Sequence, residues 1–92
     1  MDRQLIFSGS PNIKLSQSIS KRLNKDLGDI SLSTFSDGEI SVEINENVRG
    51  KDTFVIQSTN KKKKKNLMEL ILISDALKRA SARSITAVMP YF

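Results

Sequence analysis

The sequence contains no cysteine and no histidine. Without cysteine, no disulfide can brace the fold and no thiolate can act as a nucleophile. Without histidine, the chain lacks the side chain that most often serves as a general base or a metal ligand near neutral pH. Catalysis within these 92 residues would therefore depend on Asp, Glu, Lys, Arg, Ser, Thr or Tyr.

Long apolar runs are absent as well. No run approaches the ~20 residues that a membrane-spanning helix needs, and Met1 to Phe7 lack the pattern of a signal peptide. We therefore expect a soluble, cytoplasmic protein without a membrane partner. The length fits one domain or part of one, and 38% hydrophobic residues suffice for a modest core.

The net charge of +5 comes from one segment, because Lys61 to Lys65 are five consecutive lysines. The rest of the chain has ten basic and ten acidic residues. We expect the lysine run to be a solvated loop, since like charges repel and extend a chain. The alternative is a patch that contacts polyphosphate or nucleic acid. The neutrality of the other residues disfavours nucleic acid as a partner.

Five segments are short, apolar and rich in strand-forming residues. They are residues 4–8, 30–35, 40–44, 53–57 and 84–89. Asp37-Gly38, between the second and third segments, predicts a two-residue type I′ turn in which both residues have positive φ. These two strands are therefore expected to form a β-hairpin, with one face buried and the other in water.

Two further segments have the pattern of helices. The first carries an apolar stripe at four-residue spacing: Leu15, Ile19, Leu23 and Leu27. Ser10-Pro11 suits its start and Gly28 its end. The second is expected to begin with Asn66 as N-cap and Glu69 in a capping-box-like pair, and to run to about Ala80. Its apolar residues surround the helix axis, which predicts burial against the sheet and against another subunit or domain.

This order of elements predicts an α/β fold, with a mostly parallel sheet flanked by helices and a β-hairpin excursion. Ligands of such folds bind beyond the carboxyl ends of the strands. The loops 8–11 and 58–66 and the end at 91–92 are expected at that edge. The hairpin is expected to project elsewhere, where it could reach a neighbouring chain. The apolar end directly after a strand predicts that residues 1–92 are part of a larger domain.

Charged side chains crowd into one stretch, Phe35 to Gly50, which holds Asp37, Glu39, Glu43, Glu46 and Arg49. This stretch and the segments around it resemble ribose-phosphate pyrophosphokinase. The matching segments are 7–10, 35–39, 42–44, 47–50, 56–59, 66–70, 75–77, 79–82 and 85–92. So many short segments in one order make the resemblance specific along nearly the whole chain.

The resemblance implies an enzyme that transfers the β,γ-diphosphoryl group of ATP to the 1-hydroxyl of ribose 5-phosphate, with Mg²⁺. It implies two phosphoribosyltransferase-like α/β domains, and a homo-oligomer built of dimers within hexamers. Residues 1–92 would be the N-terminal part of the first domain. The catalytic residues and the Mg²⁺ ligands of the family lie beyond this chain, so none is assigned here and the chain alone is expected to be inactive.

The same resemblance implies two binding sites. Phe35 would stack on adenine in the ATP site of a neighbouring subunit, a contact of ~1–3 kcal/mol. Asp37 and Glu39 would accept hydrogen bonds from the amino edge of adenine or orient the loop. Without the resemblance, Asp37 would be only a turn residue and Phe35 only a core aromatic.

Arg49 would bind a regulatory phosphate or nucleotide near Ser81, because a guanidinium group suits phosphate oxygens. The alternative for Arg49 is a surface salt bridge with Glu46 or Asp52. For the whole chain, the alternative function is a non-catalytic regulatory or associated protein of the same family that binds the enzyme.

Overall fold

The structure is a computed structural model that describes residues 3–58 and 63–90. Its elements, in order, are β1 (Gln4–Ser8), η1 (Ser10–Asn12), α1 (Ile13–Arg22), β2 (Ile30–Thr34), β3 (Ile40–Ile44), β4 (Asp52–Ile56), α2 (Lys63–Arg79) and β5 (Ser84–Val88). The α/β class expected from the sequence is confirmed. Tyr91 and Phe92, expected at the carboxyl edge of the sheet, lie outside the described residues.

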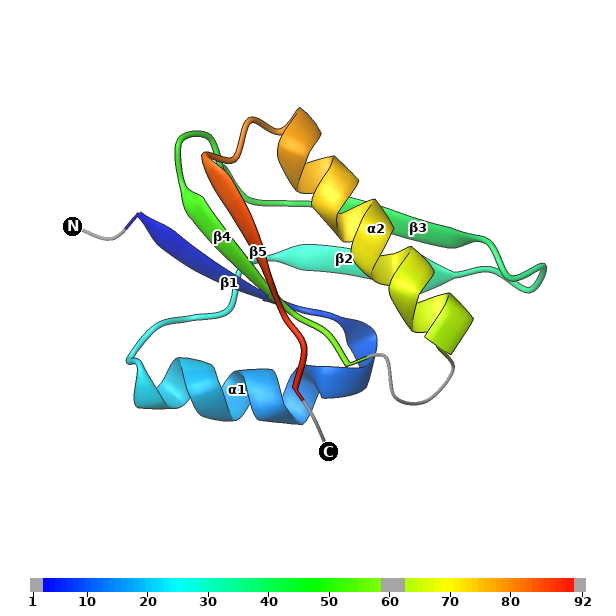
Figure 1. The fold of residues 1–92 in the computed structure, drawn as a ribbon, viewed down its shortest axis with the longest axis horizontal. Coiled ribbons are helices and arrows are strands. Elements are labelled where there is room, and N and C mark those ends of the chain that lie inside the picture. The colour runs from blue at the N-terminus through cyan, green and yellow to red at the C-terminus, as the bar shows by residue number, and fades with distance from the viewer. Residues whose placement is uncertain (1–2, 59–62, 91–92) are drawn as a thin grey trace.

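Three strands form a parallel sheet in the order β1-β4-β5, and β2 pairs with β3 in a separate antiparallel hairpin. Helix α1 covers one face of the parallel sheet, and α2 lies on its other face (Figure 1). The hairpin extends past α2, with β3 packed along this helix. The parallel sheet with a hairpin excursion is therefore the arrangement that the sequence predicts.

Side chains alternate along each strand, so neighbouring residues serve different faces. Ile6 of β1 lies toward α1, whereas Phe7 belongs to the core beneath α2. The buried core cluster consists of Phe7, Val48, Val55, Leu70, Ile73 and Leu77. Apolar residues of both hairpin strands pack against this cluster, which fixes the hairpin to the body of the fold.

Helix α1 ends at Arg22 rather than at Gly28, so the expected C-terminal boundary is wrong. Asn24 has a positive φ of 54° and turns the chain out of the helix. Leu27 then runs beside Ile6 as a parallel bridge, and the N–H of Gly28 donates to the Ile6 carbonyl at 2.7 Å. Leu27 is apolar at helical spacing, but it belongs to this strand-like pairing and not to the helix.

Helix α2 begins at Lys63, three residues before the expected start at Asn66. Lys63 to Lys65 are therefore in its first turn, and the loop expected there is wrong; Lys61 and Lys62 lie outside the described residues. Asn66 is buried inside the helix and is not its N-cap. The capping-box role of Glu69 is also wrong, because its carboxylate binds a different element.

The hairpin turn differs from the predicted type I′ turn. The Gly38 N–H donates to the Phe35 carbonyl at 2.9 Å, and the Phe35 N–H donates to the Glu39 carbonyl at 2.8 Å. Gly38 has a φ of 89°, whereas Asp37 does not have a positive φ. This is the three-residue hairpin, in which a type I turn is followed by a left-handed glycine.

Within the described ranges, no helix is both long enough and apolar enough to cross a bilayer.

Candidate functional site

The tip of the hairpin projects from the body of the fold, beyond the first turns of α2 (Figure 1). Phe35 stands where β2 ends, and 54% of its surface is exposed. It is therefore not the core aromatic that the alternative interpretation required. An exposed aromatic ring on a two-stranded support offers a flat apolar surface for stacking.

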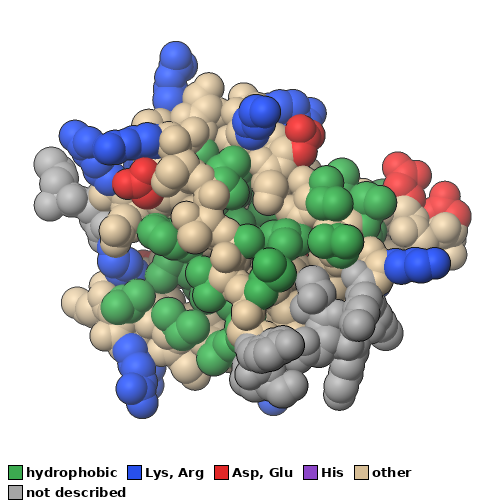
Figure 2. Space-filling model, in the orientation of Figure 1, with side chains coloured by type: hydrophobic (Ala, Val, Ile, Leu, Met, Phe, Trp, Pro, Cys, Tyr) green, Lys and Arg blue, Asp and Glu red, His purple; other side chains and the backbone are tan. Residues whose placement is uncertain are grey.

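Asp37 and Glu39 follow Phe35 within the turn, and both are exposed. The Asp37 carboxylate accepts the backbone N–H of Glu39 through Oδ1 at 3.0 Å. This bond holds the turn in one shape, so the turn role of Asp37 is part of the structure. In the space-filling view, acidic side chains stand at the hairpin end of the molecule, beside hydrophobic side chains on the face in view (Figure 2).

Arg49 and Ser81 lie together at another part of the molecule. Arg49 is in the loop before β4, and it forms an antiparallel bridge with Ala82. The N–H of Gly50 donates to the Ser81 carbonyl at 3.1 Å. Ser81 has a φ of 67°, and Gly50 has a φ of 72°. Both loops are exposed, so the guanidinium of Arg49 and the hydroxyl of Ser81 are accessible from solvent.

The salt-bridge alternative for Arg49 is not seen. Glu46 accepts the N–H of Asp29 at 2.7 Å, and Asp52 faces Arg83, with 3.7 Å between Nε and Oδ1. Among the ion pairs of the described ranges, none involves Arg49. The turn with Phe35, Asp37 and Glu39 precedes β3, whereas the loop with Arg49 follows the other end of this strand and pairs with the loop of Ser81. Figure 1 shows that β3 separates the hairpin tip from the loop before β4.

Residues 3–58 and 63–90 contain no cluster of three acidic side chains that could hold a metal ion. Mg²⁺ takes oxygen ligands such as carboxylates, and the described residues bring no such group together. Residues 3–58 and 63–90 therefore do not provide a Mg²⁺ site of their own.

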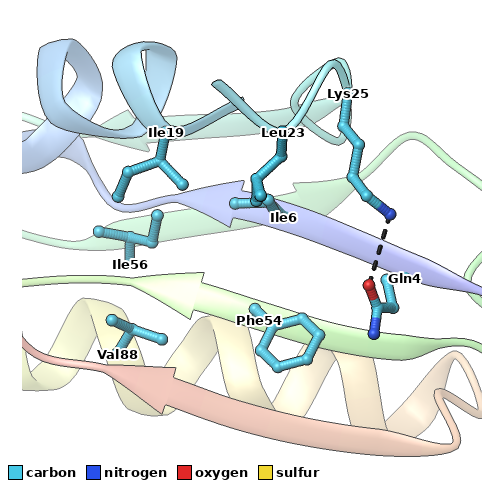
Figure 3. A pocket seen from close by; sticks show the side chains of 8 residues that line it. All are labelled: Gln4, Ile6, Ile19, Leu23, Lys25, Phe54, Ile56 and Val88. Carbon is cyan, nitrogen blue, oxygen red and sulfur yellow. Dashed lines mark hydrogen bonds between the residues drawn. The ribbon is translucent and has the colours of Figure 1, made fainter. Parts of the chain in front are cut away.

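An apolar groove of about 230 Å³ separates α1 from the parallel sheet. Figure 3 shows Ile19 of α1, and Leu23 just after this helix, facing the strand residues Ile6, Phe54, Ile56 and Val88. Lys25 donates to Gln4 at 3.4 Å at one end. The groove is lined mainly by apolar side chains and offers no acid–base pair, so it is not a candidate catalytic site.

Sequence reasoning missed a buried polar cluster at the carboxyl edge of the sheet. The side chain of Glu69 accepts hydrogen bonds from Ser10 and Gln57, and Glu69 is only 1% exposed. One signal was available, because Glu69 precedes Ile73 and Leu77 at four-residue spacing. A carboxylate in the buried stripe of a helix requires partners.

The model of one protein family, the N-terminal domain of ribose phosphate pyrophosphokinase, matches residues 4–92. The chain is 56% identical to a ribose-phosphate pyrophosphokinase of Campylobacter jejuni over 87 residues, which are 95% of this chain and 28% of that protein. It is 52% identical to the Marinomonas sp. protein of the same name over 92 residues, which are 100% of this chain and 29% of that protein. The chain thus spans less than a third of the length of these relatives.

Solved structures agree with this match. Phosphoribosylpyrophosphate synthetase from Mycobacterium smegmatis superimposes with a TM-score of 0.91 at 37% identity, covering 97% of this chain and 30% of that one. A purine phosphoribosyltransferase from Pyrococcus horikoshii superimposes with a TM-score of 0.66 at 15% identity, covering 96% of this chain and 59% of that one. The second similarity shows a shared phosphoribosyltransferase fold alone.

Proposed function

The chain belongs to the ribose-phosphate pyrophosphokinase family, and we propose that it forms the N-terminal part of an enzyme of that activity. Such an enzyme transfers the diphosphoryl group of ATP to ribose 5-phosphate, in the cytoplasm. Residues 1–92 contribute contacts to ATP and to a neighbouring subunit. The catalytic groups belong to the remaining length of the protein. The identity of 56% to a relative of that name supports this assignment.

The adenine of ATP is proposed to stack on Phe35. The observation that carries this proposal is the exposure of the Phe35 ring, 54%, on a hairpin whose turn is fixed by hydrogen bonds. A fixed turn lowers the entropic cost of binding, because the backbone that carries the ring does not need to be ordered by the ligand. Stacking on an aromatic ring stabilises a bound base by ~1–3 kcal/mol.

The carboxylates of Asp37 and Glu39 are proposed to accept hydrogen bonds from the amino group of adenine. Both are on the same turn as Phe35 and are exposed. A carboxylate only accepts hydrogen bonds when ionised, which suits the exocyclic amino donor. Because the tip projects away from the body of its own chain, we propose that it completes the ATP site of a neighbouring subunit.

Arg49 and Ser81 are proposed to form a regulatory phosphate site. Two loops place them side by side through the hydrogen bond between Gly50 and Ser81, and no ion pair of the described residues occupies the guanidinium of Arg49. A guanidinium fork with a hydroxyl nearby supplies several donors to phosphate oxygens.

The exposed apolar face of α2 is proposed to contribute to a homo-oligomer, a dimer within a hexamer. Leu67, Met68 and Ile71 are 50%, 50% and 52% exposed, whereas Ile73 and Leu77 on the other face are fully buried. Large apolar side chains gathered on one helix face are typical of interaction surfaces.

The alternative function is a non-catalytic associated protein of the family that binds the enzyme through the same hairpin and helix. A chimeric protein distinguishes the enzyme from the associated protein. In this chimera, the chain replaces the matching segment of the Campylobacter jejuni relative. Phosphoribosyl pyrophosphate formed from ATP and ribose 5-phosphate, with Mg²⁺, is then measured by mass spectrometry.

The enzyme assignment predicts that the chimera forms product and that the 92-residue chain alone does not, since positioning groups for the transferred phosphoryl are missing from it. A chimera that folds and assembles but forms no product would favour the associated protein. Product formed by the purified chain alone would contradict its proposed inactivity.

A further inference from the structure

The carboxylate of Glu69 lies between the turn after β1 and the end of β4, although α2 carries it. Its Oε1 accepts the backbone N–H of Ser10 at 2.8 Å and the Nε2 of Gln57 at 3.1 Å. Its Oε2 accepts the hydroxyl of Ser10 at 3.0 Å. Glu69 is 1% exposed, so these bonds replace its contact with water.

Glu69 accepts all three of these hydrogen bonds, two from Ser10 and one from Gln57, and donates none of them. This pattern suits the ionised carboxylate, which has acceptor sites only. No ion pair of the described residues includes Glu69, so neutral donors compensate its burial. Ser10 therefore presents an N–H and an O–H to an anion that the chain itself supplies.

The donors that surround this carboxylate are themselves fixed. Gln57 is fully buried and packs against Gly9, where an added Cβ would be 1.9 Å from Gln57 Oε1. The N–H of Gly9 donates to the Ile56 carbonyl at 2.9 Å. Asn12 accepts the N–H of Ser58 through its side chain. The turn after β1 is thus tied to the end of β4 at several points.

We propose that Glu69 is an internal anion that positions the turn after β1 by satisfying both donors of Ser10. In parallel α/β sheets, this edge is where ligands usually bind. Because both donors of Ser10 are already occupied by Glu69, they are not available to a phosphate or carboxylate of a ligand. This role of Glu69 lies in the fold of the chain, and it does not depend on the proposed function.

Chemical rescue tests the proposal in the 92-residue chain. Glu69→Ala removes the carboxylate and leaves the donors of Ser10, so the urea midpoint of the variant falls. Sodium acetate is expected to raise this midpoint again, and to return the Ser10 amide resonance toward its original position. Sodium chloride of equal ionic strength should do neither, and the original chain should not respond to acetate. Equal effects of acetate and chloride on Glu69→Ala would overturn the proposal.

If Glu69→Ala does not fold, a second variant tests the role of Glu69. Glu69→Gln keeps the shape and one acceptor oxygen but removes the charge. Since hydrogen bonds to charged groups are roughly twice as strong as neutral ones, hydrogen exchange of the Ser10 amide should become about tenfold faster. Glu43→Gln, at an exposed position of β3, is the matched control and should change nothing. An unchanged Ser10 exchange rate in Glu69→Gln would reject the role of Glu69 as an anion.

Discussion

Asp37 accepts the backbone N–H of Glu39 through Oδ1 at 3.0 Å, so one carboxylate of the hairpin tip shapes the turn that carries the other. Phe35 closes the same turn through its bond with Glu39. One set of hydrogen bonds therefore holds the backbone of the three residues proposed to contact adenine. A substitution that tests the contact with adenine must therefore keep the hydrogen bonds of the turn and remove only the contact with the ligand.

Asp37→Asn meets this requirement, because the amide oxygen can still accept the Glu39 N–H. In the chimera, we expect KM for ATP to rise about tenfold, the effect of losing one hydrogen bond to a charged group. In the 92-residue chain, the urea midpoint should stay unchanged. If Asp37 serves only the turn, Asp37→Asn will leave KM for ATP unaltered, and only Asp37→Ala will show a change.

Gly28 packs against Phe7, whose ring atom Cε1 would lie 2.4 Å from an added Cβ. Phe7 is fully buried, so Gly28→Ala should destabilise the chain by about 1–3 kcal/mol through overpacking, measured by urea unfolding. A smaller partner, Phe7→Leu, should relieve part of this cost in the double variant.

Gly38→Ala is the matched control for Gly28→Ala. Its Cβ would meet nothing within 4 Å, and its cost of about 1–2 kcal/mol would come from the positive φ alone. Phe7→Leu should therefore not reduce the destabilisation caused by Gly38→Ala. Equal relief at both glycines would contradict the packing explanation.

Lysines at the start of α2 oppose the helix dipole, because the first turn favours negative charge. Lys64 is exposed in that turn, and Lys78 is exposed in the last turn. We expect Lys64→Glu to raise the free energy of unfolding by about 0.3–1 kcal/mol and Lys78→Glu to lower it by a similar amount. Thermal unfolding at low salt measures both. Shifts of the same sign would show that net charge, rather than the dipole, controls stability.

Arg49→Ala tests the regulatory site in the chimera. We expect the concentration of inorganic phosphate that half-maximally changes activity to rise at least about tenfold, since a charge-assisted contact is lost. Arg79→Ala removes a guanidinium that is already paired with Asp75 at 3.0 Å, and it serves as the control. An unchanged phosphate response in Arg49→Ala would remove this residue from the site.

The fold class, the strands and the hairpin could be predicted from local patterns, because alternation and four-residue spacing reflect burial directly. The end of α1 could not be predicted in this way. Leu27 continues the helical spacing, but it pairs with Ile6, which is distant in sequence. The role of Glu69 was missed for the same reason. Its donors, Ser10 and Gln57, reach it only in the folded chain.

At the candidate sites, the sequence predicted the residues themselves but not their surroundings. The exposure of Phe35 could not be read from its position at a strand end, because burial depends on what α2 covers. The pairing of the Arg49 and Ser81 loops needs the register between β4 and β5. The roles of these residues in binding remain predictions.

The most direct test of the account is KM for ATP in the chimera carrying Phe35→Leu. Loss of stacking of ~1–3 kcal/mol should raise KM for ATP by about 5- to 150-fold. KM for ribose 5-phosphate and the urea midpoint should stay unchanged, and Phe35→Tyr should bind ATP as the original does. An unchanged KM for ATP in Phe35→Leu would contradict the proposal that the hairpin contacts adenine.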